Sequence, residues 1–380
     1  MLRTFRIGGI HPPENKLSAG KKITALATPK QVIIPLSQHI GAPAQAVVKK
    51  GDLVKVGTLL AKAGGFVSAN IHSSVSGKVN KIDNALDASG YKRPAIYIDV
   101  EGDEWEETID RSETLVKECT LSSKEIVDKI AASGIVGLGG ATFPTQVKLM
   151  PPPGNKAEIV IINAVECEPY LTSDHSLMLE KGEQILVGVT ILMKAVNVNK
   201  AVIGIENNKP DAIAHLSDLV RACGDARLSV CPLKTKYPQG GERMLIRAVT
   251  GRYLNSRLLP ADRGCIVMNV ASVLAAYGAI SCGRPLTHCI MTVTGDAVSS
   301  PCNLEVPVGT SYAAVLAEAG GFSAEPEKVI SGGPMMGTAL FSLDIPVTKT
   351  ASSILALRHD PVALHDASPC IHCGHCLHAC

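Results

Sequence analysis

The sequence predicts a multidomain protein whose largest part is an α/β domain, with a β module before it and a smaller β module after it. Short β-branched runs separated by Gly and Pro fill residues 31–100, and strand-like and helix-like segments alternate between residues 122 and 232. Four cysteines crowd the last eleven positions, which predicts a separate metal-binding segment. At about 100–200 residues per domain, 380 residues allow two to four domains.

The composition excludes several classes of protein. Apolar residues make up 46% and charged residues 19%, so buried cores are expected and disorder is not. Aromatic residues are only 3% and the formal net charge is +2, which argues against a nucleic-acid-binding surface. The N-terminus has no apolar segment typical of a signal peptide, so we expect free thiols in a reducing cytoplasm. The uncharged stretch Gly264–Gly283 contains polar residues and glycines, which favours a buried helix with flanking turns over a transmembrane segment.

The first 110 residues predict an arm and a β module. Residues 1–30 are polar and are expected to form an arm without a core. Residues 31–110 contain V-x-x-G-D-x-V-x-x-G-x-L and then I-H-S-x-x-S-G-x-V, a pattern that resembles the lipoyl/biotinyl barrel-sandwich fold. Carrier proteins of that fold hold their cofactor on a lysine at a hairpin tip. The corresponding tip, residues 64–71, has no lysine, so we expect a structural or docking module.

The rest of the chain predicts three further parts. An acidic linker is expected around residues 101–120. Residues 115–285 predict the α/β domain, because strands at 158–163, 200–206 and 228–232 alternate with helices, as in a mostly parallel sheet. Residues 286–347 predict a β-grasp module in the order β-β-α-β, and residues 348–380 predict a linker and the start of a helical iron–sulfur domain.

The most specific motif is C-x2-C-x2-C-x3-C at the C-terminus, formed by Cys370, Cys373, Cys376 and Cys380. Thiolates at this spacing can wrap a [4Fe–4S] cluster. A zinc site is the competing interpretation, but zinc motifs usually consist of two separated cysteine pairs. The interleaved His372, His375 and His378 could compete as ligands, although loop positions between the cysteines suit them better.

A glycine-rich loop is the second motif. Gly137, Gly139 and Gly140 precede Phe143 and Lys148. Glycines let the backbone approach a flavin phosphate or ring closely, and the lysine supplies a positive charge. The loop lacks the spacing of a dinucleotide-binding fingerprint and the Gly-Lys-Ser/Thr of a Walker loop. A structural turn is the alternative interpretation.

Polar residues follow the strand EIVIIN directly, at Asn163, Glu166 and Glu168. Ligand sites of α/β proteins form at the carboxyl ends of strands, where carboxylates and amides can bind flavin hydroxyls or a nicotinamide amide. Capping of the next helix is the alternative role, more for Asp174 than for the two glutamates. Glu242 opens another helix, so complementing the helix dipole is its alternative role.

These motifs together resemble known flavoproteins. Gly137–Leu149 is similar to the flavin loop G-R-G-G-A-G-F-P-T-G-x-K-W of the flavin subunit of respiratory complex I, with Thr142 in place of a glycine. Asn163–Glu168, Tyr237–Glu242 and Met268–Val270 are similar to its N-A-D-E-x-E-P, Y-x-x-G-E-E and N-N-V. The series GGIHPPENK, GLGGATFPT, ECEPYLTSDH, SGGPMMG and CIHCGHCLHAC, over essentially the whole chain, resembles the RnfC family, the peripheral subunit of the ferredoxin:NAD⁺ oxidoreductase complex Rnf, also called Rsx.

The resemblance implies an oxidoreductase subunit that passes electrons between NAD(H), FMN and [4Fe–4S] clusters. It would lie on the cytoplasmic face of the bacterial inner membrane, without a transmembrane segment of its own, and would assemble with the other Rnf membrane and iron–sulfur subunits. Glu168 and Glu242 would lie near the nicotinamide and Phe143 near the stacked NADH, as positioning residues and not as acid or base catalysts. The resemblance implies FMN contacts from Gly137, Gly139, Gly140, Lys148, Asn163, Glu166 and Asn269.

Two other functions fit parts of this pattern. One is a cobalamin reductase of propanediol-utilising microcompartments. The other is a non-catalytic scaffold subunit of a quinone reductase, which the C-terminal cysteines disfavour. Because the sequence stops at Cys380, where two-cluster proteins continue into a second cysteine run, we also expect a truncated copy in which the pair of clusters is incomplete.

Overall fold

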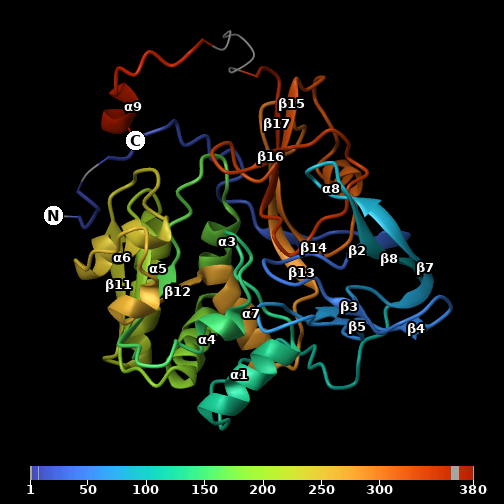
Figure 1. Ribbon diagram of the computed structural model, residues 1–380, viewed down its shortest axis with the longest axis horizontal. Coiled ribbons are helices and arrows are strands. Elements are labelled where there is room, and N and C mark those ends of the chain that lie inside the picture. Colours follow the sequence, from blue (N-terminus) through green and yellow to red (C-terminus); the bar gives the residue numbers. More distant parts are fainter. Residues whose placement is uncertain (1, 7, 361–367, 380) are drawn as a thin grey trace.

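The computed structural model describes residues 2–6, 8–360 and 368–379. Figure 1 shows the α/β domain on one side and the two β modules on the other, with the C-terminal segment crossing above them. The predicted order of parts along the chain is therefore found. Four sheets account for the strands that the described residues form.

The barrel-sandwich module consists of two antiparallel sheets, in the orders β2-β8-β7-β4 and β3-β5-β6. Its core includes Val32, Ile34, Leu60, Ile96 and Ile98, all fully buried. The last two strands extend beyond the β-branched runs Gly77–Lys81 and Ala95–Val100, from which the sequence predicts them, and form a long hairpin. The strands are β2 Gln31–Pro35, β3 Gln45–Ala46, β4 Leu53–Val54, β5 Leu59–Lys62, β6 Ile71–His72, β7 Gly77–Leu86 and β8 Lys92–Val100.

The α/β domain is built on a four-stranded parallel sheet in the order β11-β10-β9-β12. Apolar cores cover both faces, one under α1, α4, α5 and α7 and the other under α6, as expected of parallel strands that are apolar throughout. The strands are β9 Ile159–Asn163, β10 Ala201–Glu206, β11 Leu228–Leu233 and β12 Cys265–Asn269. The helices are α1 Ser123–Ala132, α2 Thr145–Lys148, α3 Ser173–Glu180, α4 Gly182–Ala195, α5 Pro210–Cys223, α6 Glu242–Thr250 and α7 Val270–Ser281, with the 3-10 turn η1 Pro260–Arg263.

The uncharged stretch near residue 270 forms a strand and then a helix. The prediction of one buried helix is right for α7 and wrong for β12, because a short, fully buried apolar run has the same pattern in either structure. Asn269 lies at the junction and caps α7, since its Oδ1 accepts a hydrogen bond of 2.8 Å from the Ala271 N–H. No helix among the described residues is long and apolar enough to span a membrane.

The third module is a six-stranded mixed sheet in the order β1-β14-β13-β17-β15-β16. Two of its strands come from segments that the sequence assigns to the arm and to the C-terminal linker. β1 pairs in parallel with β14, and the buried β17 lies between β13 and β15. The elements are β1 Ile23–Ala25, β13 His288–Thr294, β14 Cys302–Pro307, α8 Tyr312–Glu318, β15 Lys328–Ser331, β16 Thr338–Ala339 and β17 Ser353–Leu357; the short helix α9 His375–Ala379 follows.

The polar arm is packed, contrary to the prediction. Arg3 forms a bridge beside Leu233 at the end of β11, and Ile10 exchanges two backbone hydrogen bonds of 2.8 Å with Tyr237. Phe5 is buried. The few apolar side chains of the arm are too widely spaced for a sequence pattern to indicate that the arm packs on the α/β domain.

The acidic linker also contributes to the core, because Ile109 is buried. Trp105 of the same segment forms a bridge beside Val56 of the first module.

Candidate functional site

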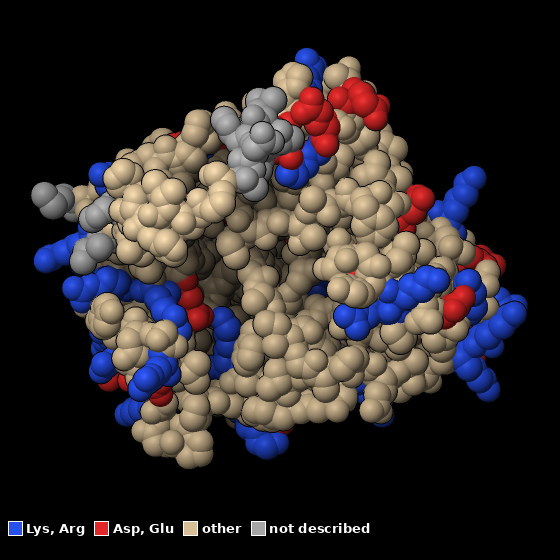
Figure 2. Space-filling model, turned by 45° about the horizontal axis from the view of Figure 1, so that its top comes forward, with Lys and Arg blue, Asp and Glu red and all other residues tan. Residues whose placement is uncertain are grey.

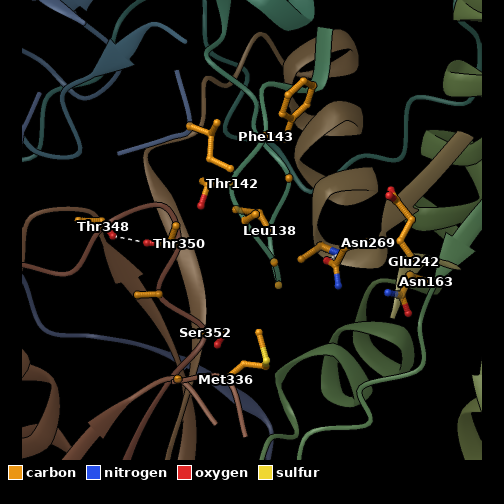
Figure 3. Close-up of a pocket in the computed structure, with 18 of the residues that line it drawn as sticks. Leu138, Thr142, Phe143, Asn163, Glu242, Asn269, Met336, Thr348, Thr350 and Ser352 are labelled. Carbon is orange, nitrogen blue, oxygen red and sulfur yellow. Dashed lines mark hydrogen bonds between the residues drawn. The ribbon is translucent and has the colours of Figure 1, made fainter. Parts of the chain in front are cut away.

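A cavity of about 1540 Å³ lies where the three modules meet. Figure 2 shows it as a deep hollow, with acidic and basic side chains on one wall. It is larger than the range of about 300–1,000 Å³ that is usual for a small-molecule site. The strand ends and the glycine loop of the α/β domain form one wall, and the third module forms the opposite wall (Figure 3).

The glycine loop is held against α7 and leaves its tip open to the cavity. The Leu138 N–H donates a hydrogen bond of 2.7 Å to Ser272 Oγ, and the Gly137 N–H donates one of 2.8 Å to Phe143 O. Gly139 has φ +70°, and a Cβ there would lie 2.8 Å from Asn269 Nδ2, whereas a Cβ at Gly140 would meet nothing within 4 Å. A side chain at Gly139 would therefore displace Asn269.

Thr142 closes the same loop in an unusual conformation. Its φ is +54°, a region that β-branched residues rarely adopt, and its side chain is buried. The loop path thus suits a glycine at this position, as the complex I motif has. The backbone carbonyl of Thr142 accepts a hydrogen bond of 3.4 Å from the Ile40 N–H, which attaches the loop to the barrel-sandwich module.

Lys148 and Glu242 come together at the cavity wall. Lys148 Nζ lies 3.1 Å from Glu242 Oε1, and it also donates a hydrogen bond of 3.3 Å to Val267 O. Both side chains are partly exposed, so the ion pair itself adds little stability but keeps a cation at the cavity wall. Glu242 is the first residue of α6, so its expected role at the helix dipole and its place in the cavity are compatible.

Asn163 and Glu166 organise the loop after β9. Asn163 Nδ2 donates a hydrogen bond of 2.9 Å to Gly240 O, which joins this loop to the turn before α6. Glu166 caps α3, because its carboxylate accepts hydrogen bonds from the Asp174 and His175 N–H groups at 2.7 and 3.2 Å. The sequence favoured Asp174 for the cap, and this assignment is wrong: Glu166 has φ +47°, which turns its side chain back to the helix start.

Asp174 points to Asn269. Asn269 Nδ2 donates a hydrogen bond of 2.8 Å to Asp174 Oδ2, so the two residues form a polar pair beside Gly139. Burial, and next the nearby Glu166 carboxylate, raise the pKa of Asp174 to about 7. No sequence pattern indicates this pair, because the two residues are 95 positions apart.

Glu168 reaches across the cavity to the third module. Its Oε2 accepts a hydrogen bond of 3.1 Å from the Met335 N–H, and a Cβ at Gly333 would lie 2.3 Å from the same oxygen. Its other oxygen, Oε1, is buried without a hydrogen-bond partner among the described residues. Burial raises the pKa of Glu168.

Phe143 lies on the glycine loop, but its ring points away from the opposite wall in Figure 3. Leu138, Asn163, Glu242 and Asn269 occupy the wall around the loop. The structure thus brings together the predicted residues of the α/β domain at one cavity and leaves the Phe143 ring outside its centre.

Lys16 is a residue that the sequence analysis missed. Its Nζ donates three hydrogen bonds, to the carbonyl oxygens of Glu166, Glu168 and Leu171, at 3.1, 2.8 and 2.7 Å. Burial lowers its pKa, and Glu166 is the main group that opposes this effect. The arm therefore fixes the acidic loop from outside the cavity, through the lysine of GGIHPPENK.

Lys349 joins the three modules and was also missed. Its Nζ donates hydrogen bonds of 2.8 Å to Asn70 O and 2.7 Å to Gly134 O, and its backbone N–H donates one of 3.0 Å to Gln38 Oε1. The side chain is 1% exposed, and burial lowers its pKa to about 7. Gly134 begins the segment that leads into the glycine loop.

Three of the four predicted iron–sulfur ligands lie in the described chain. Cys370, Cys373 and Cys376 are exposed, and Cys380 lies outside the described residues. The His372 N–H donates a weak hydrogen bond of 3.4 Å to Cys370 Sγ, a contact of the kind that stabilises thiolate ligands. In the described part of the chain, no group of three or more His, Cys, Asp or Glu side chains is arranged to hold a metal ion. The thiols suit an iron–sulfur cluster by their chemistry, but this arrangement does not bring them together.

The cavity residues fit FMN. The open tip at Gly140 admits a flat or charged group close to the backbone, and Lys148 supplies a cation. The amides of Asn163 and Asn269 provide hydrogen-bond donors and acceptors on the same wall. The volume is sufficient for a second ligand beside a flavin.

Comparisons with known proteins match three parts of the chain. The model of the RnfC barrel sandwich hybrid domain matches residues 4–103, the Nuo51 FMN-binding domain matches residues 130–278, and the SLBB domain matches residues 290–339. The flavin-domain match contains the glycine loop and the acidic loop. The expected fold class is confirmed by these matches.

Two of the relatives that match almost the entire chain are C subunits of ferredoxin:NAD(+) oxidoreductase complexes. The C subunit of the proton-translocating ferredoxin:NAD(+) oxidoreductase complex of Clostridium ljungdahlii is 48% identical, over 100% of this chain and 82% of the relative. The C subunit of the Na(+)-translocating ferredoxin:NAD(+) oxidoreductase complex of Acetobacterium woodii is 46% identical, over 99% and 84%.

A solved NAD⁺-reducing [NiFe]-hydrogenase shares the fold over 64% of this chain and 48% of its own, with a TM-score of 0.53 and 22% identity.

Because the two C subunits match almost the entire chain at 48% and 46% identity, the chain belongs to the family of C subunits of ion-translocating ferredoxin:NAD(+) oxidoreductase complexes.

Proposed function

We propose that this chain is the electron-entry subunit of a membrane-associated ferredoxin:NAD⁺ oxidoreductase complex, and that it passes electrons between NAD(H), FMN and iron–sulfur clusters. The observation that supports this most is the large cavity on which the glycine loop, Lys148, Asn163 and Asn269 converge. The names of the relatives support the reaction and the assembly with other subunits. We place the chain on the cytoplasmic face of the membrane, as a peripheral subunit.

The residues of the glycine loop would bind FMN through close backbone contact. Gly139 and Gly140 leave the space that the cofactor needs, and Lys148 would turn from Glu242 to a phosphate without leaving the cavity wall. Glu166 would act indirectly, because it caps α3 and so positions Asp174 beside Asn269. When bound, FMN links a two-electron hydride donor to one-electron iron–sulfur acceptors.

The hydride donor would bind between the flavin site and the third module. Glu168 and Glu242 remain the proposed neighbours of the nicotinamide, since both line the cavity. A stacking role for Phe143 requires its ring to turn toward the cavity. Hydride transfer needs no proton donor from the protein, so these residues position and orient.

The thiolates of Cys370, Cys373 and Cys376, with Cys380, would hold the iron–sulfur cluster that receives the electrons. These cysteines distinguish the proposed function from a scaffold, which needs no redox group.

Anaerobic NADH titration of the FMN-loaded chain tests the proposal. We expect about one FMN per chain after gel filtration and loss of the oxidised-flavin absorbance when NADH is added. A chain that retains no FMN, or whose flavin NADH does not bleach, would contradict the proposal and favour a scaffold. The variant Gly139→Ala tests the position of the flavin independently of NADH.

A further inference from the structure

The third module contributes a loop to the cavity that none of the flavin-site motifs includes. The segment Ser331–Gly337 has the sequence SGGPMMG and connects β15 to β16. It is tightly folded: Gly332 has φ +98°, and the Gly337 N–H donates a hydrogen bond of 2.9 Å to Gly333 O. We call this segment the methionine loop.

Glu168 of the α/β domain holds the methionine loop in place. The hydrogen bond from the Met335 N–H to Glu168 Oε2 joins two residues that are 167 positions apart, and we call this contact the clasp. Any side chain at Gly333 would collide with the same carboxylate, because a Cβ would lie 2.3 Å from Oε2. The glycine is therefore required by this contact between modules.

The clasp directs an exposed apolar side chain into the cavity. Met336 is 79% exposed, although its neighbours are fixed, Met335 by the clasp and Gly337 by its hydrogen bond to the loop backbone. Figure 3 shows Met336 in the space between the two walls, with Leu138 and Asn269 across from it. An exposed, flexible thioether suits contact with a flat ring.

The chemistry of the walls identifies the class of ligand. Hydroxyl groups of Thr348, Thr350 and Ser352 lie on the same side as Met336, and amide and carboxylate groups lie on the α/β side. A ligand between them meets hydrogen-bonding groups on both sides and an apolar contact for a ring. A dinucleotide, with two sugars and two flat bases, meets these requirements.

We propose that the methionine loop is the outer wall of the dinucleotide site, with Met336 in contact with a base of NAD(H) and Glu168 as the residue that positions the loop. This rests on the proposed function, and it adds that the site is shared between two modules. The α/β domain binds the flavin, and the third module determines how tightly the dinucleotide binds.

The main test compares Met336→Ala with Met244→Ala. Met244 is an exposed methionine on α6 that does not line the cavity, so it is a matched control. With ferricyanide as the acceptor, we expect Met336→Ala to raise the KM for NADH at least threefold, with kcat within twofold of the parent. Calorimetric titration with NAD⁺ should show a similar loss of affinity, and the FMN content should be unchanged. Equal KM and Kd values for parent and Met336→Ala would overturn the inference.

The clasp is tested with two variants of Glu168. Glu168→Gln keeps an oxygen that can accept the Met335 N–H, and Glu168→Ala removes it. We expect Glu168→Ala to lose at least threefold more of the parent's affinity for NAD⁺ than Glu168→Gln loses. If both variants lose affinity equally, the charge of Glu168 acts on the ligand directly and the clasp is overturned. A parent protein that NADH cannot reduce would refute the proposed function itself, which is a separate outcome.

Discussion

The buried Lys349 makes the junction of the three modules sensitive to pH, and Lys349→Met tests this. The methionine keeps most of the side-chain volume and removes the titrating group. It also leaves the carbonyl groups of Asn70 and Gly134 without their donor. At pH 7 these losses oppose the gain from removing a buried amine. The informative quantity is therefore how the difference in unfolding free energy between parent and variant changes with pH.

The size of this pH dependence follows from the pKa of Lys349, which burial lowers from 10.5 to about 7. Between these values the unfolded chain binds a proton that the folded protein does not bind. Raising the pH through this window therefore stabilises the folded protein, with a slope that approaches about 1.4 kcal/mol per pH unit. Below about pH 7 both states are protonated and the effect is constant. Between pH 7 and pH 9, we expect the parent to gain about 2 kcal/mol of unfolding free energy relative to Lys349→Met.

Urea unfolding at a series of pH values measures this difference. Trp105, the single tryptophan, stacks on His288 of the third module, so its fluorescence reports the junction. Burial, and next the charge of Lys349, lower the pKa of His72 to about 3. Burial also lowers the pKa of His39, so both histidines are neutral in this range. A difference between parent and variant that stays constant from pH 7 to pH 9 would refute the reasoning.

Three further predictions concern the cofactors and the arm. Gly139→Ala should lower the FMN content of the purified protein at least fivefold, because the added Cβ displaces Asn269. Absorbance spectra measure the FMN content, and Gly65→Ala is the control. Lys16→Met should weaken FMN binding several-fold and lower the unfolding free energy by about 1–3 kcal/mol, because three carbonyl groups lose their donor; Lys22→Met, at an exposed position, is the control. Cys373→Ser should remove most of the iron bound after anaerobic reconstitution, as measured by iron analysis.

Each of these variants has an outcome that contradicts its prediction. Full FMN occupancy in Gly139→Ala would place the flavin elsewhere in the cavity. Parent-like flavin affinity in Lys16→Met would mean that the arm covers the acidic loop without fixing it. An unchanged iron content in Cys373→Ser would remove this residue from the ligand set.

The sequence predicts elements well where burial produces a regular pattern. The strand β9 is apolar at every position before Asn163, and β10 is apolar up to Glu206, so both were expected from their residues alone. The runs Gly77–Lys81 and Ala95–Val100 predict the hairpin β7–β8 too short, because Ala85 is the one buried residue of its outer half and the sequence there shows no alternation. The sequence predicts a helix where β12 lies, because a buried strand beside a buried helix forms one continuous apolar run.

For the candidate site, too, the sequence predicts only the residues that belong to a local pattern. Local motifs indicated the glycine loop and the residues after β9, because glycine geometry and strand ends leave a signal within a few positions. Lys16 and Lys349 leave no such signal in the sequence. Their partners are carbonyl groups as many as 279 residues away, and any residue type supplies a carbonyl. Contacts to the backbone are invisible in a single sequence. They become predictable only when the path of the chain is known.

The packed arm has a consequence for the order in which this protein assembles. Arg3 and Ile10 form bridges beside Leu233 and Tyr237, which lie more than 220 positions later in the chain and at the edge of the parallel sheet. Contacts of such long sequence separation form slowly and late. We therefore expect the arm to dock after β11 has joined the sheet. We expect amide hydrogen exchange at Ile10 to be faster than exchange in β9, because β9 is paired with a strand on each side.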